Sequence, residues 1–258
     1  MAKTIAFIFS LMSKFRITQI IFFLLLIGGF AIGNFFLITG IIFVFIAIVS
    51  FGSFNIQSNF HLTAINKVVN NENKIVLSFD DGPNKNITPK VLDILKEYNC
   101  KAVFFCIGKN IIGNEYILQR IYNEGHLIGN HSYSHSYWFD LFPSKKMQDE
   151  IKQTNDLIFA ITADKNNLFR PPYGVTNPML AKAIKRENML TIGWNKRSLD
   201  TVIKNIEKVI VRITKNLKSG DIILLHDHLE NAPQILKEFL EEIKKTNLKV
   251  ERLDNLIK

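Results

Sequence analysis

The distribution of hydrophobic and polar positions divides the chain into two unlike parts. Residues 17–66 contain no Asp, Glu, Lys or Arg, whereas the rest of the chain alternates short apolar runs with amphipathic stretches. As a single helix, the apolar run 17–54 would measure about 57 Å, nearly twice the ~30 Å hydrocarbon core of a bilayer. We therefore expect two membrane spans, at residues 17–32 and 35–51, which form a helical hairpin within a membrane segment covering residues 1–66.

A cleaved signal peptide is the alternative interpretation of this N-terminal segment. The apolar region of a signal peptide is usually ~7–15 residues long and ends at a small-residue cleavage site, and no clear site of that kind follows Ser50. We therefore expect a retained hairpin, an integral cell membrane protein and the lipid bilayer as a partner. Lys3, Lys14 and Arg16 place the N-terminus in the cytoplasm by the positive-inside rule. Two spans return the chain to that side and one span leaves the C-terminal part outside, so the side of the membrane stays open.

Residues 67–258 show strand-like runs that alternate with amphipathic helical stretches. Strands are expected at residues 75–79, 102–107, 126–129, 168–170, 190–193, 222–225 and 249–252. Helices are expected at residues 88–98, 115–123, 144–161, 178–186, 203–217 and 233–245. This alternation predicts an α/β fold with a largely parallel sheet, either a barrel or a doubly wound sheet.

Composition and charge exclude several classes of protein. The 258 residues carry 32 Lys and Arg against 23 Asp and Glu, a formal net charge of +9, and include 13 Gly, 7 Pro and 2 Cys. These values exclude a disordered chain, a collagen-like repeat and a disulfide scaffold. The basic residues form no stripe with interleaved aromatics, so no nucleic-acid partner is expected. Cys100 and Cys106 lie about 20 Å apart in an extended chain, too far for a disulfide. The sequence does not indicate an oligomeric state.

Polar residues gather where the predicted strands end, the edge at which parallel α/β folds place their sites. Asp80 and Asp81 directly follow the first strand and precede Gly-Pro, a pattern that also fits a turn with a helix-capping acid. His131 and His135 have the i, i+4 spacing that projects two imidazoles from one face of a helix, where a divalent metal can bridge them. Such pairs also occur on surfaces without a metal. A site with three protein ligands would need a carboxylate, from Asp80 or Asp81.

Three further polar groups follow later strands. Arg170 begins an Arg-Pro-Pro-Tyr-Gly segment, in which the double Pro makes a rigid extended turn. Trp194 follows the next strand and Asp200 comes soon after it. His226 ends the most apolar strand of this part of the chain. A histidine in that position suits acid–base chemistry, because its pKa lies near neutrality.

These five groups, in this order, resemble the motifs of the polysaccharide deacetylase family (carbohydrate esterase family 4). The resemblance covers about residues 70–256 and identifies residues 67–258 as a polysaccharide deacetylase-like catalytic domain, here of a membrane-anchored member. It implies a distorted (β/α) barrel with about seven strands, fewer than the usual eight, preceded by the transmembrane hairpin.

The resemblance also assigns roles to individual residues. Asp81, His131 and His135 match the metal ligands of the family. Asp80 matches the general base, and Arg170 matches the residue that keeps the carboxylate of that base ionised. The bound cofactor is expected to be a divalent metal, with zinc first and cobalt, nickel or manganese as alternatives.

The resemblance assigns two more roles, those of the oxyanion donor and the general acid. The backbone N–H of Tyr173 matches the donor to the tetrahedral oxyanion, and His226 matches the general acid, with Asp200 as its charge partner. Thr201 stands where many members carry Trp, which implies a more open or more polar wall of the pocket.

The implied activity is a metal-dependent hydrolase that removes N-acetyl groups from an amino-sugar polysaccharide, such as peptidoglycan or a chitin-like chain. One alternative keeps the chemistry and changes the substrate to a lipid-linked sugar, deacetylated or deformylated at the membrane surface. A catalytically silent sugar-binding protein would have lost a metal ligand or Asp80, and all of these are present. An iron oxygenase can use two histidines and one carboxylate, but the separate base and His226 argue against it.

Overall fold

The computed structural model describes residues 13–69 and 72–257. Its N-terminal part is a helical hairpin. Its helices are α2 (Lys14–Ile32) and α3 (Phe35–Phe54), and they contain both of the predicted helical runs. At 1.5 Å per residue each helix is about 30 Å long. The two helices pack against each other, with the rings of Phe22 and Phe45 stacked 4.0 Å apart. By length and composition, both can cross a membrane.

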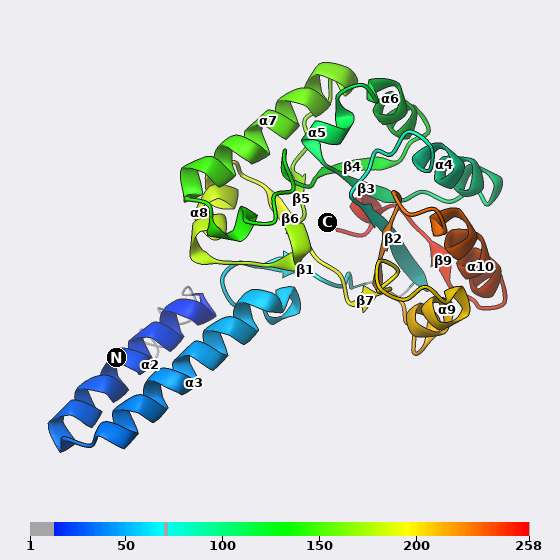
Figure 1. Ribbon diagram of the computed structural model, residues 1–258. Helices are drawn as coiled ribbons and strands as arrows, with labels where there is room; N and C mark the ends of the chain where they lie inside the picture. The colour runs from blue at the N-terminus through cyan, green and yellow to red at the C-terminus, as the bar shows by residue number, and fades with distance from the viewer. Residues whose placement is uncertain (1–12, 70–71, 258) are drawn as a thin grey trace.

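A curled, wholly parallel sheet forms the centre of the rest of the chain (Figure 1). Its order is β1-β6-β5-β4-β3-β2-β8-β7, and β9 pairs with the start of β2. The strands are β1 (Ala64–Ile65), β2 (Lys74–Asp80), β3 (Val103–Cys106), β4 (Leu127–Asn130), β5 (Leu168–Phe169), β6 (Leu190–Ile192), β7 (Lys196–Arg197), β8 (Ile222–His226) and β9 (Lys249–Val250).

The chain between β6 and β7 closes the curl. The Gly193 N–H donates to Ile65 in β1, and two residues later the Asn195 N–H donates to Ile222 in β8. The two edges of the sheet are therefore joined by three residues of irregular chain, which makes the barrel a distorted one.

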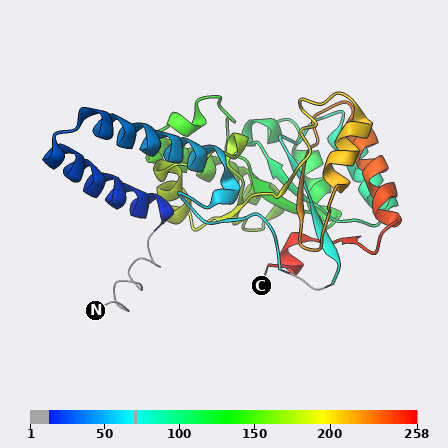
Figure 2. The same cartoon turned by 90° about the horizontal axis from the view of Figure 1, so that it is seen from below.

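Helices cover the outer face of this barrel (Figure 2). They are α4 (Thr88–Glu97), α5 (Gly108–Ile111), α6 (Glu115–Asn123), α7 (Ser144–Thr162), α8 (Pro178–Arg186), α9 (Ile206–Thr214) and α10 (Ala232–Lys244). Short 3₁₀ turns are η1 (Ile56–Ser58), η2 (Phe139–Leu141), η3 (Pro172–Gly174) and η4 (Leu253–Asn255).

The two-residue period of a strand decides which side chains enter the barrel. In β2, Ile75, Leu77 and Phe79 belong to the core under the helices. Val76 belongs to a second core cluster, which also holds inward residues of β3 and β8. Asp80 has the same parity as Val76 and is buried. A polar residue at the end of an apolar strand is thereby fixed on the inner face.

All seven predicted strands are confirmed, and so is the α/β class. The short strands β1 and β7 and the single-turn helix α5 were not predicted, because two to four residues carry no periodic signal. Cys100 and Cys106 are free thiols, as expected.

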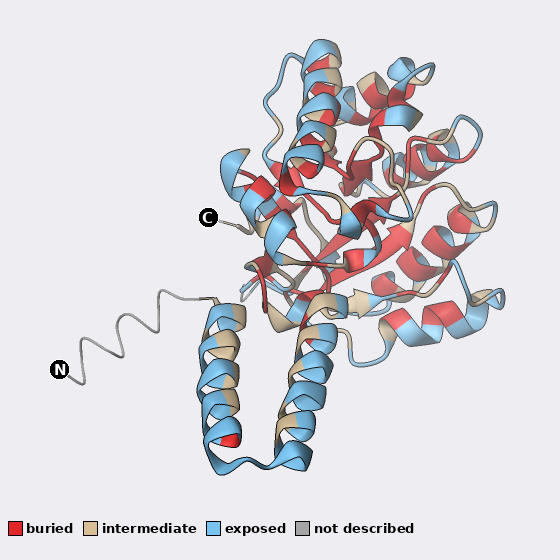
Figure 3. Ribbon diagram, turned by 60° about the vertical axis from the view of Figure 1, so that its left-hand side comes forward, coloured by how far each residue is buried: buried red, intermediate tan, exposed pale blue. Residues whose placement is uncertain are grey.

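The hairpin joins the barrel through a packed segment rather than a loose linker. Ile56, Phe60 and Ala64 are buried, and β1 pairs with β6 ahead of the predicted domain boundary at residue 66. The Phe15 N–H donates to the Phe60 carbonyl at 3.1 Å. Figure 3 shows the contrast that results: α2 and α3 are exposed along most of their length, whereas the strands of the barrel are largely buried.

Candidate active site

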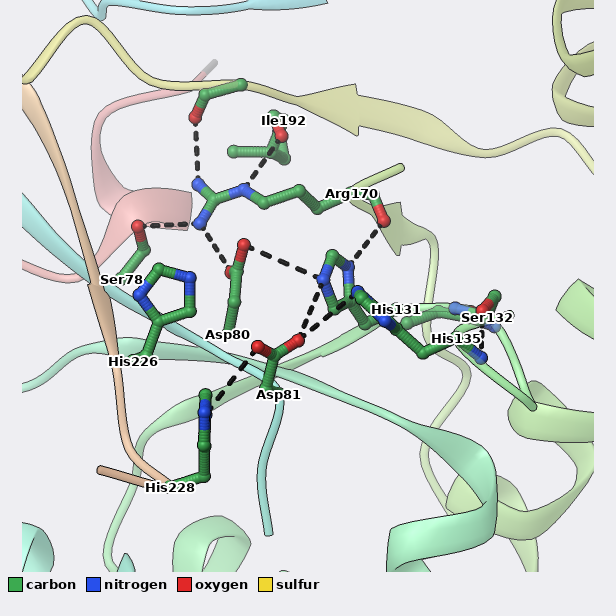
Figure 4. A network of polar contacts seen from close by, with 12 residues as sticks. Ser78, Asp80, Asp81, His131, Ser132, His135, Arg170, Ile192, His226 and His228 are labelled. Atoms are coloured by element: carbon green, nitrogen blue, oxygen red, sulfur yellow. Dashed lines mark hydrogen bonds and ion pairs between the residues drawn. The ribbon is translucent and has the colours of Figure 1, made fainter. Parts of the chain in front are cut away.

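Asp80 and His226 lie side by side at the carboxyl ends of neighbouring strands. They are register partners in the parallel pair β2–β8. Both have inward parity, and Figure 4 shows them near Asp81, His131 and Arg170, with dashed lines joining Asp80 to Arg170 and to His131. The carboxylate of Asp80 and the imidazole of His226 thus lie at the same edge of the sheet, as the sequence predicted.

Arg170 lies beneath this network and is wholly buried. Its guanidinium donates to Asp80 Oδ1 at 2.7 Å and to Ser78 Oγ at 2.8 Å. It also donates to the backbone carbonyls of Ile192 and Gly193, and it lies 4.1 Å from the centre of the Phe105 ring. A buried charge needs this full set of partners. The guanidinium therefore holds one oxygen of Asp80 in place and leaves the other, Oδ2, directed toward His131, 3.7 Å from its Nε2.

Replacing Arg170 with Met is expected to destabilise the fold. The change leaves Asp80 as an unpaired buried charge, and breaking a buried pair in this way costs about 3–5 kcal/mol. The double variant R170M/D80N removes both charges and is expected to recover part of that loss, whereas the exposed Arg186→Met is expected to change stability by less than about 0.5 kcal/mol. Denaturant unfolding of the full chain in detergent measures all three. Equal stability of R170M and R186M would contradict the pairing described here.

Asp81, His131 and His135 form a cluster of three ligand atoms that lie within 4.8 Å of one another. Asp81 Oδ1 is 3.4 Å from His131 Nε2 and 3.3 Å from His135 Nε2. That oxygen is buried and has no hydrogen-bond partner among the described residues. Between the two candidate carboxylates, the geometry selects Asp81 for the cluster, while Arg170 engages Asp80.

The two histidines do not project from a helix, contrary to the expectation from their spacing. Residues 131–135 form a loop in which Ser132 and His135 adopt positive φ angles of 62° and 47°. The carboxylate of Glu150 accepts the backbone N–H groups of both Tyr133 and Ser134, at 3.0 and 2.7 Å. A half-buried carboxylate on α7 thus replaces the hydrogen bonds that a helix would supply, and the loop still brings both imidazoles to Asp81.

The protonation pattern of the cluster suits a metal ion. His131 Nδ1 lies 2.8 Å from the carbonyl oxygen of Arg170. A carbonyl only accepts, so Nδ1 donates to it and Nε2 is the ring nitrogen that faces Asp81, the orientation typical of a ligating histidine. Burial lowers the pKa of His135 to about 4, which keeps that imidazole neutral.

The charges of the cluster are coupled. Burial acts to raise the pKa of Asp81, but the neighbouring imidazole of His131, 3.4 Å away, outweighs it and holds that pKa below its usual range. Burial acts against a charged His131, yet the carboxylates of Asp80 and Asp81 raise its pKa. A cation that binds the Nε2 atom of His131 must displace the proton that this nitrogen carries when the imidazole is charged. Acid is therefore expected to weaken metal binding.

His226 is paired with Asp200 on the opposite side of Asp80. Its Nδ1 lies 2.7 Å from Asp200 Oδ1, and its backbone N–H donates to Asp200 Oδ2. Burial acts to lower the pKa of His226, but the hydrogen bond to Asp200 overcomes it, and the pKa rises to about 9. Ser198 donates a further hydrogen bond to Asp200. At neutral pH this imidazole is therefore protonated.

Tyr173 lies in the turn η3, with φ 58° and ψ 0°, outside the helical region. Its ring centre is 4.7 Å from that of His135. Gly174 has φ +72°, and a Cβ there would meet the Trp194 ring at 2.4 Å. Packing against Trp194 thus holds the turn that carries the Tyr173 N–H next to the cluster.

Two further residues lie close to the site, and the sequence assigned a role to neither. Asp227 is buried beneath Gly82, accepts from the Thr88 hydroxyl at 2.6 Å, and has its pKa raised to about 7 by burial. His228 Nδ1 lies 3.5 Å from Asp81 Oδ2. Both directly follow His226 at the end of β8, and this position in the sequence was the only signal that they lie near the site. By contrast, His61 and His126 are buried away from the cluster, where His61 pairs with Ser53 and His126 with the Ala102 N–H.

Comparison with known proteins is consistent with this geometry. Residues 67–192 match the family model described as "Polysaccharide deacetylase". A peptidoglycan-N-acetylglucosamine deacetylase of Bacillus cereus is 35% identical over 202 residues, which cover 74% of this chain and 92% of that protein. The peptidoglycan-N-acetylmuramic acid deacetylase PdaA of Bacillus subtilis is 32% identical over 192 residues, or 72% of each chain.

A solved structure shows the same fold without assuring activity. A CE4 family pseudoenzyme from Bacillus anthracis superposes with a TM-score of 0.70 at 25% identity, covering 76% of this chain and 69% of that one. Similarity of fold alone is therefore no proof of catalysis in this architecture. The Asp-His-His triad, which is typical of the family, is present in this chain together with the paired Asp80 and His226.

Proposed function

The chain belongs to the polysaccharide deacetylase family, and from that premise we propose that it is a membrane-anchored hydrolase that removes N-acetyl groups from the amino sugars of peptidoglycan. One observation carries the proposal: Asp80, in register with His226 on the neighbouring strand, lies beside the Asp81–His131–His135 cluster, with its Oδ2 3.7 Å from His131 Nε2. The relatives that act on peptidoglycan support the choice of substrate. Release of acetate from purified peptidoglycan tests it.

The donor set fits a divalent metal ion. Two neutral imidazole nitrogens and one carboxylate oxygen are a common ligand set for zinc, and three protein ligands leave positions open for substrate or water. We propose zinc, with cobalt, nickel and manganese as functional substitutes. When bound, the ion polarises the amide carbonyl and lowers the pKa of a water molecule. The unpartnered Asp81 Oδ1 between the two Nε2 atoms supports this placement.

Asp80 is the proposed general base. Its Oδ1 is held by Arg170 and its Oδ2 lies beside His131, so the carboxylate is fixed next to the cluster. A water molecule that attacks the carbonyl gives up a proton as the C–O bond forms, and Asp80 takes that proton. The Tyr173 N–H is the proposed donor to the oxyanion that develops, an interaction worth about 3–4 kcal/mol in comparable sites.

His226 is the proposed general acid. The sugar amine is a poor leaving group unless its nitrogen is protonated, and the imidazolium beside Asp200 has a proton to give. Collapse of the tetrahedral species then breaks the C–N bond and releases acetate and the free amine. The catalytically silent alternative is not favoured, since Asp80, His226 and all three residues of the cluster are present.

The alkaline limit of activity is expected to follow His226. The pKa of His226 is raised from the ordinary value of 6.5 to about 9. The imidazole is therefore fully protonated below pH 6.5 and loses its charge as the pH rises through 9. We expect kcat/KM to fall above about pH 9, and Asp200→Asn to move this limb toward lower pH by removing the main support of the imidazolium. pH–rate profiles of both proteins measure the shift; an unmoved alkaline limb in the variant would refute the assignment.

The hairpin is proposed to be a retained membrane anchor. A signal peptide would have to be cut after the spans, yet Ile56, Phe60 and Ala64, which follow them at once, are part of the buried core. The spans are almost entirely exposed, unlike the core helices of a soluble protein. Their ~30 Å length matches the hydrocarbon core of a bilayer.

A second substrate class is favoured by one observation. The start of α2 lies at the barrel end of the hairpin (Figure 1), and there Lys14 Nζ donates to the Ser58 carbonyl at 2.6 Å. The positive-inside rule assigns this end, with Lys14 and Arg16, to the cytoplasm. A cytoplasmic barrel would meet lipid-linked precursor sugars and not the finished polymer. A reporter fused after Lys258 that is active only outside the cytoplasm supports the polymer, and one that is active only inside supports the lipid-linked sugar.

A further inference from the structure

Large apolar side chains are exposed beside the site, on the flank of the barrel that carries the hairpin. Tyr137, Trp138 and Leu141 are 73%, 60% and 70% exposed, and Met179, at the start of α8, is 51% exposed. We call these four residues the apolar rim. Exposed side chains of this size and number on one flank mark a contact surface.

Hydrogen bonds tie the rim to the end of α3. The carbonyl of Ser53, in the last turn of α3, accepts the Thr176 N–H at 2.9 Å. The next residue, Asn177, caps α8 and donates from its side chain to the Asp140 carbonyl in η2 at 2.6 Å. Figure 1 shows α8 and the adjoining end of α7 on the side of the barrel from which the hairpin extends. The rim is thus held at the level where the membrane spans end.

The chemistry of this stretch matches the boundary of a bilayer. Trp and Tyr are enriched at membrane–water interfaces, where the apolar ring is buried and the polar edge meets headgroups. Lys145 and Lys146 follow the rim at the start of α7, and the Lys146 Nζ lies 3.5 Å above the Phe142 ring. Lysines beside aromatic side chains favour anionic headgroups over a neutral partner. The basic residues at the start of α2 lie at the same end of the hairpin.

We propose that the apolar rim inserts into the headgroup region of the bilayer and holds the mouth of the active site against the membrane surface. The inference rests on the proposed retention of the hairpin as an anchor. The rim adjoins the site itself, because the ring of Tyr137 lies 6.4 Å from that of Tyr173, which in turn lies 4.7 Å from His135. Substrate then enters along the membrane surface, and glycan close to the bilayer is processed in preference to distant glycan.

Tryptophan fluorescence tests this directly, since the chain has 2 Trp and Trp194 is buried. The full-length protein is reconstituted in vesicles of phosphatidylcholine and phosphatidylglycerol that contain lipid brominated near the headgroup end of the acyl chain. We expect quenching of the Trp138 emission and loss of the quenched component in Trp138→Phe. In that background Val211→Trp, on α9 away from the hairpin, is the matched control and is expected to stay unquenched.

Resistance of the chain to alkaline extraction from the vesicles is measured in the same samples. A chain that is extracted overturns the anchor and the rim together. A chain that stays in the bilayer while Trp138 remains unquenched overturns the rim and leaves the proposed anchor standing. Quenching of both Trp138 and Val211→Trp would show general adsorption of the barrel and would also overturn the rim. If chito-oligosaccharide in solution, rather than the bilayer, perturbs Trp138, the rim is a glycan-binding surface and the proposal is wrong.

Discussion

Full-length protein treated with a strong chelator is expected to lose acetate release by at least about 10³-fold, and added Zn²⁺ is expected to restore it. The size follows from the several kcal/mol of charge stabilisation that a bound divalent ion supplies to a developing oxyanion, at 1.36 kcal/mol for each factor of ten. The protein contributes the site through Asp81, His131 and His135, whose ligand atoms already converge.

Matched histidine variants separate the ligands from their neighbours. His131→Ala removes one of the three converging ligand atoms, the His131 Nε2, and is expected to abolish both metal binding and activity. His228→Ala removes an imidazole that also lies near Asp81 but stands outside the three-ligand cluster, so it is expected to keep its metal. Bound metal per chain is measured by elemental analysis. Full metal content in His131→Ala would contradict the assigned ligand set.

Asp80→Asn is expected to lower kcat by about 10²–10⁴-fold, the range typical of a lost general base, while the metal stays bound. The amide is nearly isosteric with the carboxylate, and the Arg170 contact to Oδ1 can persist, so the loss reports on proton transfer. Asp227→Asn is the matched control: it alters a buried acid whose pKa is raised to about 7 by burial and which contacts Thr88 rather than the cluster. We expect that variant to stay within about tenfold of the wild type. Full activity of Asp80→Asn with metal bound would show that Asp80 is not the base.

The sheet and its chemical edge were predictable because their signals are local. An apolar run that ends in Asp80-Asp81 predicts a buried strand and also places polar side chains at its carboxyl end. The apolar run that ends in His226 does the same for a second strand. Parallel pairing then brings the two together without further information, as the register of β2 and β8 confirms. The motif order in turn identified the family.

The parts that were missed depend on contacts distant in sequence. The loop that carries His131 and His135 is shaped by Glu150, which lies 17 residues beyond Tyr133 and 16 beyond Ser134. The i, i+4 spacing of the two histidines alone favoured a helix. The contact between Ser53 and Thr176, which joins the hairpin to the active-site flank, has no counterpart in the local pattern. Strand β1 is two residues long and is held in place by pairing with β6, not by its own composition.

The central claim is that one metal cluster, one base and one acid at this sheet edge cleave an N-acetyl group. The most direct measurement is the release of acetate, together with new free amino groups, from purified peptidoglycan or from its lipid-linked precursor by the zinc-loaded full-length protein, with Asp80→Asn as the blank. The account predicts equal amounts of acetate and amine from the wild type and none above background from the variant. A folded, zinc-loaded protein that releases no acetate from either substrate would contradict it.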